Sequence, residues 1–196
     1  MTTRARKAIR ARWILALVAL AAACGGGGGL VTIFVPVEVS EQTIKGFAPQ
    51  SAQGQCNPGV QGTGSLGPDG FQPLSINLKA SKELEGQSFL RFTHVELKKI
   101  TLTILIPPSQ QGQTWDFVDS ISIFADDPST SDPPVLVAKL DPVPRGITQM
   151  VIPGTGVDIS DIASADHFTV SGSANGRPPC ADVHFNGQAD FDVSIF

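Results

Sequence analysis

The chain contains no tyrosine, and its 196 residues include only two tryptophans. Trp13 lies in an apolar segment near the start, so Trp115 is the one tryptophan in the rest of the chain. Proteins that bind sugars or nucleobases commonly stack them on exposed aromatic rings. The eleven phenylalanines can fill a core but have no polar tip. The composition therefore argues against an aromatic platform for glycans or bases.

Basic residues are scarce beyond the first 23 positions, because five of the fourteen lie in that stretch with no acidic residue among them. These five are Arg4, Arg6, Lys7, Arg10 and Arg12. Without residues 1–23 the chain has 14 − 5 = 9 lysines and arginines against 18 acids, a net charge of −9. Nucleic acids and anionic membrane surfaces attract cationic patches, so neither is expected as an electrostatic partner.

Long apolar runs are also missing, except for the 11 residues at 13–23 that follow the basic stretch. A basic stretch, a short apolar run and small residues at its end are the features of an export signal. Residues 20–24 read LAAAC and resemble the lipobox of bacterial lipoproteins, in which small residues precede an invariant cysteine. The resemblance implies cleavage before Cys24, lipidation of its thiol and acylation of the new amino terminus with chains such as palmitate.

Two other interpretations of this segment stay open: a secretory signal with a chance cysteine, and an uncleaved membrane helix. The second is weak, because 11 apolar residues span only about half of the ~30 Å hydrocarbon core. By the same resemblance, a glycine rather than an aspartate at position 25 implies the outer membrane of a Gram-negative host. The five glycines at 25–29 predict a flexible tether. The expected organisation is a helical signal peptide at 1–23, anchor and tether at 24–29, and one domain at 30–196.

Only three cysteines are present. If Cys24 carries lipid, Cys56 and Cys180 remain, and the export signal places them in an oxidising compartment where two cysteines usually bridge. We therefore predict a Cys56–Cys180 disulfide closing a loop of 180 − 56 = 124 residues. The alternative is two isolated buried thiols.

Alternation of apolar and polar residues with period two predicts strands rather than helices after the tether. The Gly-, Gln-, Ser- and Pro-rich residues 47–73 form a long irregular segment, interpreted as a covering flap pinned by Cys56. One helical turn is expected at 157–165, capped by Asp158 or Ser160. The predicted strands are residues 30–39, 74–80, 89–106, 115–125, 135–140, 147–152 and 167–171, followed by a hairpin at 183–195.

Eight or nine short strands with little helix favour an all-β antiparallel β-sandwich. In size and rhythm this domain resembles the immunoglobulin-like domains of bacterial surface proteins. A phase switch between Leu97 and Ile100 predicts a bulge or tight turn there. Asn186-Gly187 is the preferred pair for a type I′ turn and indicates the terminal hairpin. Three acids alternate with apolar residues there and are expected to face solvent and protect a sheet edge: Asp182, Asp190 and Asp192.

Motifs for catalysis or cofactor binding are weak. Residues 62–67 (GTGSLG) match GxGxxG, but turn-forming residues flank them instead of the strand and helix that dinucleotide binding requires. There is no GxSxG elbow, and a Ser-His-Asp set can be assembled only by unconstrained choice. No histidine has a second His or Cys at ligand spacing. We expect outward-facing strand histidines, no cofactor and no catalytic residue; the histidines are His94, His167 and His184.

Acidic residues gather in two turns, one of them holding Asp158, Asp161 and Asp166. Calcium prefers oxygen ligands from flexible loops. The calcium candidates are the acids of the other turn, Asp126, Asp127 and Asp132. The EF-hand pattern is absent, however, and the same composition is typical of solvated turns.

The leading expectation is a membrane-anchored envelope lipoprotein whose non-catalytic β-sandwich serves in adhesion, envelope structure or assembly. Its partners would be the membrane, through the lipid anchor, and an envelope protein or glycan, with no nucleic acid. The alternative is a ligand-binding module, glycan-binding or calcium-dependent. A secreted hydrolase would require a pocket that groups a histidine with an acid and a serine. A sandwich hosts many functions, so the molecular role depends on the site.

Overall fold

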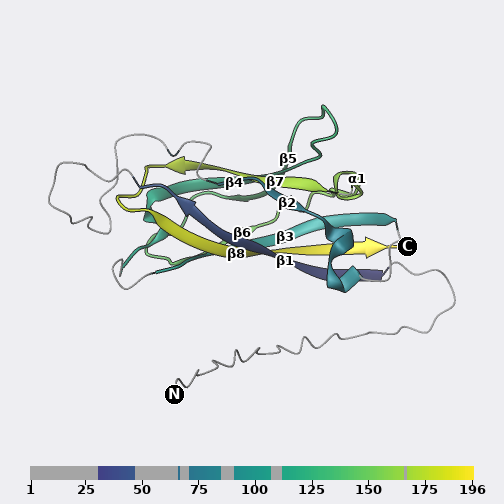
Figure 1. Cartoon of the computed structure of the whole chain (residues 1–196), viewed down its shortest axis with the longest axis horizontal. Coiled ribbons are helices and arrows are strands. Elements are labelled where there is room, and N and C mark those ends of the chain that lie inside the picture. The colour runs from purple at the N-terminus through teal and green to yellow at the C-terminus, as the bar shows by residue number, and fades with distance from the viewer. Residues whose placement is uncertain (1–30, 47–65, 67–70, 85–90, 107–111, 166) are drawn as a thin grey trace, which may run out of the picture.

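Eight β-strands form most of the regular secondary structure in the computed structural model, which describes residues 31–46, 66, 71–84, 91–106, 112–165 and 167–196 (Figure 1). The strands are β1 (Val31–Ile44), β2 (Leu74–Ile76), β3 (Phe92–Ile104), β4 (Val118–Asp126), β5 (Val135–Leu140), β6 (Gln149–Pro153), β7 (Phe168–Gly176) and β8 (Val183–Ile195). The short helical elements are α1 (Ser160–Ala163) and the 3₁₀ turns η2 (Leu78–Ala80), η3 (Lys82–Leu84) and η5 (Trp115–Phe117).

The strands form two antiparallel four-stranded sheets, ordered β1-β8-β3-β6 and β2-β7-β4-β5, which lie as two layers in Figure 1. The pairs β1–β8, β2–β7, β3–β6 and β4–β5 are those of one long hairpin with its tip at β4–β5, rolled into two layers. Among the described strands, every connection except β4–β5 crosses between the sheets. This is the strand order of an eight-stranded jelly roll.

The expected all-β antiparallel sandwich is therefore confirmed, but its immunoglobulin-like order is not. In an immunoglobulin domain the first two strands are neighbours in one sheet. Here the first strand pairs with the last, from Val31 opposite Ile195 to Ile44 opposite Val183. Alternation in the sequence shows only which face of a strand is buried. Because both folds need the same alternation, it cannot distinguish one strand order from the other.

The expected terminal hairpin is wrong, because β8 is one continuous strand of 13 residues between β1 and β3. Gly187 lies inside this strand, where a Cβ atom would be only 2.4 Å from the carbonyl oxygen of Thr101 on β3. The glycine thus serves close approach of two strands, not a turn with positive φ. Since β8 has a neighbour on each side, continuing straight lets its backbone groups pair along both.

The bulge predicted in β3 is present, as the register with β8 shifts between Leu97 and Lys99. Opposite it, Gly154 donates its N–H to the carbonyl of Lys98 at 2.8 Å. A Cβ on Gly154 would lie 1.7 Å from the Leu97 carbonyl oxygen, so only glycine fits there. The extra residue leaves Lys98 and Lys99 both exposed, although they are adjacent in a strand.

Local hydrogen bonds account for elements that differ from the expected ranges. The strand expected at 115–125 begins with the turn η5, and the strand expected at 74–80 ends early in η2. The side chain of Asn77 accepts the N–H of Ala80 at 3.1 Å, which stabilises η2 instead of a longer strand. The helix α1 lies within the expected 157–165, and Asp158 accepts the Ser160 N–H at 2.9 Å.

An aromatic group anchors the core between the two sheets. Trp115 is fully buried, and its indole N–H donates to the Thr148 carbonyl at 3.2 Å. The ring of Phe185 lies 5.5 Å from that of Trp115 and 5.5 Å from that of Phe71. Phe71 and Leu66, both from the expected irregular segment at 47–73, are buried. These two residues therefore cover the core, while Cys56 and the rest of the GTGSLG motif lie outside the described residues.

Candidate functional site

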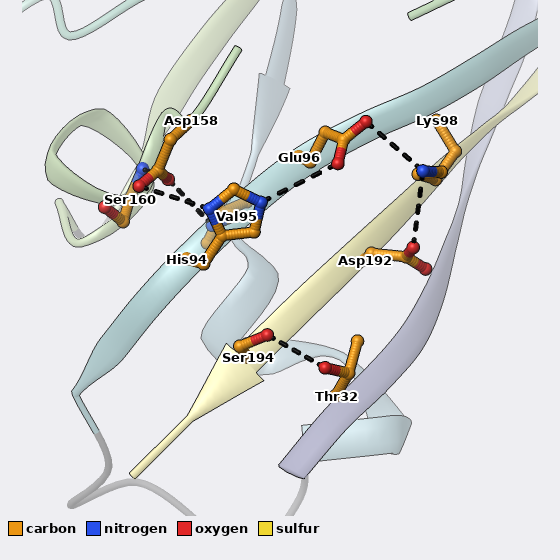
Figure 2. Close-up of polar contacts among 9 residues, drawn as sticks. All are labelled: Thr32, His94, Val95, Glu96, Lys98, Asp158, Ser160, Asp192 and Ser194. Atoms are coloured by element: carbon orange, nitrogen blue, oxygen red, sulfur yellow. Dashed lines mark hydrogen bonds and ion pairs between the residues drawn. The ribbon is translucent and has the colours of Figure 1, made fainter. Parts of the chain in front are cut away.

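A group of five titratable side chains lies on the solvent face of β3 and β8, near α1 (Figure 2). Alternation along β3 places His94 and Glu96 on this face, opposite Ser194 and Asp192 of β8. We call the group the His94 cluster; its members are His94, Glu96, Lys98, Asp158 and Asp192.

Glu96 and Asp192 are directly opposite each other, a like-charge pair that would destabilise the sheet if left alone. The bulge at Lys98 resolves this repulsion. The Lys98 ammonium lies 3.2 Å from a Glu96 oxygen and 3.8 Å from an Asp192 oxygen, as Figure 2 shows. The lysine thus lies between the two acids and offsets part of their repulsion. The phase switch in β3 is the sequence signal for this arrangement.

Asp158 fastens the loop before α1 to the edge of β3. One of its carboxylate oxygens accepts the N–H groups of Val95 at 3.0 Å and of Ser160 at 2.9 Å. The other lies 3.3 Å from Nδ1 of His94. Partial burial opposes ionisation of Asp158, but the hydrogen bonds from Val95 and Ser160 and the nearby His94 outweigh it and lower the pKa of the carboxyl. The ionised form of Asp158 is therefore the one that holds the loop before α1 against β3.

The cluster has the residue types of a Ser-His-Asp site but not its geometry. Nδ1 of His94 faces Asp158, and Nε2 lies 3.7 Å from Glu96. The hydroxyl of Ser194, on the strand beside His94, pairs instead with the hydroxyl of Thr32 at 2.9 Å (Figure 2). Both ring nitrogens thus face carboxylates, whereas a general base needs one nitrogen aimed at the nucleophile. The arrangement supports a structural ion network.

The other two histidines lie away from this cluster. His184 lies toward the opposite end of β8, with Nδ1 at 3.0 Å from the Thr43 hydroxyl and 3.2 Å from a Glu41 carboxylate oxygen. His167 is exposed just before β7. Within the described residues no group of three or more His, Cys, Asp or Glu side chains could hold a metal ion.

The calcium candidates serve the turn between β4 and β5. Asp127 accepts hydrogen bonds from the hydroxyl of Ser129 at 2.6 Å and from its N–H at 2.9 Å. These two bonds, the hydroxyl's first, lower the pKa of Asp127. The backbone carbonyl of Asp126 accepts from Thr169, and the N–H of Asp132 donates to Thr130. The contacts of Asp127 with Ser129 are those of an Asx turn. Such a turn explains the presence of aspartate here without a bound cation.

The acids on β8 do not protect a sheet edge, because β8 is an inner strand. Asp190 is 4% exposed. Its carboxylate accepts from the Gln188 amide at 2.5 Å and lies 3.5 Å from the Lys99 ammonium. Asp182, in the connection before β8, binds Lys45 at 2.7 Å, and the hydrogen bonds from Lys45 and from the Gly46 N–H lower its pKa. Both acids thus tie β8 to its neighbours.

The cysteine predictions rest largely on positions outside the described residues, since Cys24 and Cys56 both lie there. Cys180 is 6% exposed and is disulfide-bonded. Its pairing with Cys56 stays a prediction, as does the lipidation of Cys24. No helix within the described ranges is long and apolar enough to cross a membrane.

A small apolar cleft opens between the sheets beside the buried aromatic group. Its cavity volume is about 40 Å³, within about 380 Å³ of non-atom space that includes the open solvent at its mouth. Phe71 and Phe185 form one wall, and Gln42, Gln72 and Ser171 supply the polar atoms. The remaining lining is apolar: Val39, Leu74, Ile100, Leu102, Ile123, Val170 and Gly172. The sequence could not show this cleft, because its lining comes from strands paired over long separations.

Comparisons with known proteins identify no family. No protein-family model matches the chain, and no curated protein matches it. Among solved structures it is similar to the protein in "Crystal structure of decameric BFDV Capsid Protein", with 8% identity, a TM-score of 0.41 and coverage of 86% of this chain and 99% of that one. It is also similar to a chain in "Structure of Turnip Yellow Mosaic Virus at 100 K", with 10% identity, a TM-score of 0.26 and coverage of 86% and 96%. A chain of Desmodium yellow mottle tymovirus has 12% identity, a TM-score of 0.24 and coverage of 100% and 97%. With every TM-score below 0.5, these likenesses carry no argument about function.

Proposed function

We propose that this chain is a lipoprotein of the bacterial cell envelope, held in the outer membrane through Cys24, with a non-catalytic jelly-roll domain that serves in adhesion, envelope structure or assembly. The observation that carries the proposal is the short distance in sequence between the expected anchor at Cys24 and the first strand of the domain. The lipobox-like residues 20–24 are followed by five glycines and Leu30, and β1 begins at Val31, seven residues after the cysteine.

The His94 cluster supports a non-catalytic role. Its acids and bases lie on an open sheet face, where they contact one another or the backbone. Catalytic groups usually converge on a concave site that excludes water. A solvated ion network on a rigid sheet is better suited to stabilising the surface of the domain than to catalysis.

Lipidation is tested by the intact mass of the protein extracted from membranes of a Gram-negative host. We expect a chain that begins at Cys24 and carries acyl groups, and a Cys24→Ser variant that is no longer membrane-bound. A wild-type protein without acyl mass would contradict the proposal. Gly25→Asp is the matched test of destination, since an aspartate after the cysteine favours the inner membrane. Unchanged sorting of that variant would reject the outer-membrane assignment.

The assembly role is tested by crosslinking the anchored protein in its native envelope. We expect a recurrent envelope partner to copurify with it. Its recovery as an uncrosslinked monomer, under conditions that crosslink known envelope complexes, would count against adhesion and assembly alike.

A second candidate function is the binding of a small apolar ligand in the cleft between the sheets. The cavity volume of about 40 Å³ leaves room only for a small group such as a short alkyl chain, and the apolar walls favour such a group over a glycan. Because Phe185 contacts Trp115, a ligand in the cleft should change the tryptophan emission. A Val170→Trp variant would not serve as a control, since it adds a second indole; Val170→Phe fills the cleft without one. Equal responses of wild type and V170F would exclude the cleft as the binding site.

A further inference from the structure

Exposed apolar side chains gather where β1 begins and β8 ends. Val31 is 55% exposed, Phe34 51% and Phe196 73%. The register pairs Val31 with Ile195 and Thr32 with Ser194, so residues 31–34 lie beside 192–195 and Phe196 follows directly. We call this surface the end patch; it consists of Val31, Thr32, Phe34, Ser194 and Phe196, with Thr32 and Phe34 on the solvent face of β1 and Val31 on the opposite face at the end of the strand.

The five side chains of the end patch are uncharged, and their two hydroxyl groups are already paired. The hydroxyls of Thr32 and Ser194 bond to each other at 2.9 Å. Covering the patch with an apolar medium would therefore leave neither hydroxyl without a partner. The His94 cluster borders the end patch on the same face, since Phe34 lies opposite Asp192 and Ser194 lies opposite His94. Exposed apolar patches of this kind mark interaction surfaces.

The length of chain before β1 identifies what can cover the patch. Cys24 and Val31 are 31 − 24 = 7 residues apart, a path that spans at most about 25 Å when fully extended. A flexible glycine-rich chain of this length has a typical end-to-end distance of about 15 Å. The 13 residues of β3 extend over about 43 Å, so the far end of the sandwich lies well beyond that distance. Figure 1 places the start of β1 and the end of β8 at the same end of the domain.

We propose that the end patch rests on the lipid surface that holds Cys24, so that the domain stands with the β1–β8 end against the membrane and the far end of β3 directed away from it. This inference rests on the proposed lipidation. The contact is apolar rather than ionic, since the chain after residue 23 carries −9 and anionic lipids would repel it. Apolar side chains of this kind enter the headgroup region by several ångströms.

The test places a tryptophan at each end of the sandwich and measures its quenching by lipids with brominated acyl chains. Phe34→Trp reports on the end patch, and Ile106→Trp is the matched control, because Ile106 is 41% exposed just beyond the far end of β3. Wild-type Trp115 is fully buried and gives the background. The lipidated full-length mature variants are reconstituted into phosphatidylcholine vesicles and recovered by flotation.

We expect brominated lipid to quench F34W by about twofold or more and to leave I106W at the wild-type background. The contact should persist at high salt, because it does not depend on charge. Equal quenching of F34W and I106W in floating, lipidated protein would overturn the inference and leave the proposed anchor intact. Protein that lacks acyl mass and does not float would overturn the anchor and, with it, this orientation.

A second variant tests whether the patch itself holds the domain in place. In Phe196→Trp protein the introduced indole should be quenched, and adding Phe34→Ser should reduce that quenching while flotation is unchanged. Since Phe34 is exposed, the substitution leaves the core alone. Undiminished quenching in the double variant would show that the tether alone sets the orientation and would refute the role of the patch.

Discussion

Replacing Gly187 by alanine tests the central position of β8 in the sheet. The added Cβ would lie 2.4 Å from the Thr101 carbonyl oxygen and 2.7 Å from a Leu102 methyl, where ordinary contacts begin near 3.4 Å. The backbone of β3 would have to move by about 1 Å, a form of overpacking that costs about 1–3 kcal/mol. Each strand hydrogen bond weakened by the shift adds about 1 kcal/mol. Alanine recovers about 0.5–1 kcal/mol of backbone entropy, so we expect a net loss of about 1–3 kcal/mol.

Asn186→Thr is a second variant, and its stability distinguishes a continuous β8 from a turn at this position. Asn186 is exposed and lies opposite Thr103 within the ladder, where a β-branched residue is favourable. In a type I′ turn the same position would need positive φ, which a β-branched residue resists. Urea unfolding followed by the fluorescence of Trp115, the one tryptophan after residue 23, gives both free energies. A threonine variant as unstable as Gly187→Ala would refute the continuous strand.

Three further predictions follow from contacts in the core, the His94 cluster and the cysteines. Phe71→Ala should lower the free energy of unfolding by about 3 kcal/mol, because it removes a buried ring that packs on Phe185, and urea unfolding measures it. Asp158→Asn keeps an oxygen for both N–H groups but loses the charge; since the folded pKa is lowered, the wild-type advantage should be present above pH 3.8 and vanish as pH falls through the lower folded value. Because this side chain is 43% exposed, the difference at neutral pH should stay below about 1 kcal/mol, and an advantage that grew in acid would contradict the assignment. Reduction should free two thiols in the mature protein and cost up to about 4–5 kcal/mol if Cys56 pairs with Cys180; labelling of both without reductant would exclude the bridge.

The features that could be predicted from the sequence are those set by neighbours along the chain. The strand expected at 135–140 has the same bounds in the structure. The bulge in β3 was predicted because Leu97 and Ile100 cannot share a face in a regular strand, and the register shift confirms it. The short helix α1 falls inside its expected range. In each case the deciding interaction lies within a few residues, so local spacing carries the information.

The residues of the candidate site, in contrast, are distant in the sequence, so local spacing does not predict their contacts. His94 and Asp158 are 64 residues apart in the chain, yet their side chains lie 3.3 Å apart. Nothing in the spacing indicates that Ser194 would turn toward Thr32 and away from the histidine. Phe34 is a case that the sequence could have indicated, because Ile33, Phe34 and Val35 are all apolar and alternate faces, so one face of the strand must expose an apolar residue.

The error at Asn186-Gly187 and the missed strand order have one physical cause. The preference of this pair for type I′ turns is a local free energy of about 1 kcal/mol or less, set by the φ values that each residue tolerates. A continuous β8 instead forms ladders with β1 and β3 along most of its length, and the net gain of many strand hydrogen bonds exceeds one turn preference. Those ladders pair residues as distant as Val31 and Ile195, and period-two alternation constrains the face of each strand but not its neighbour. The neighbour of Gly187 in the sequence favours a turn, whereas the role of Gly187 in the fold is set by Thr101 on the adjacent strand.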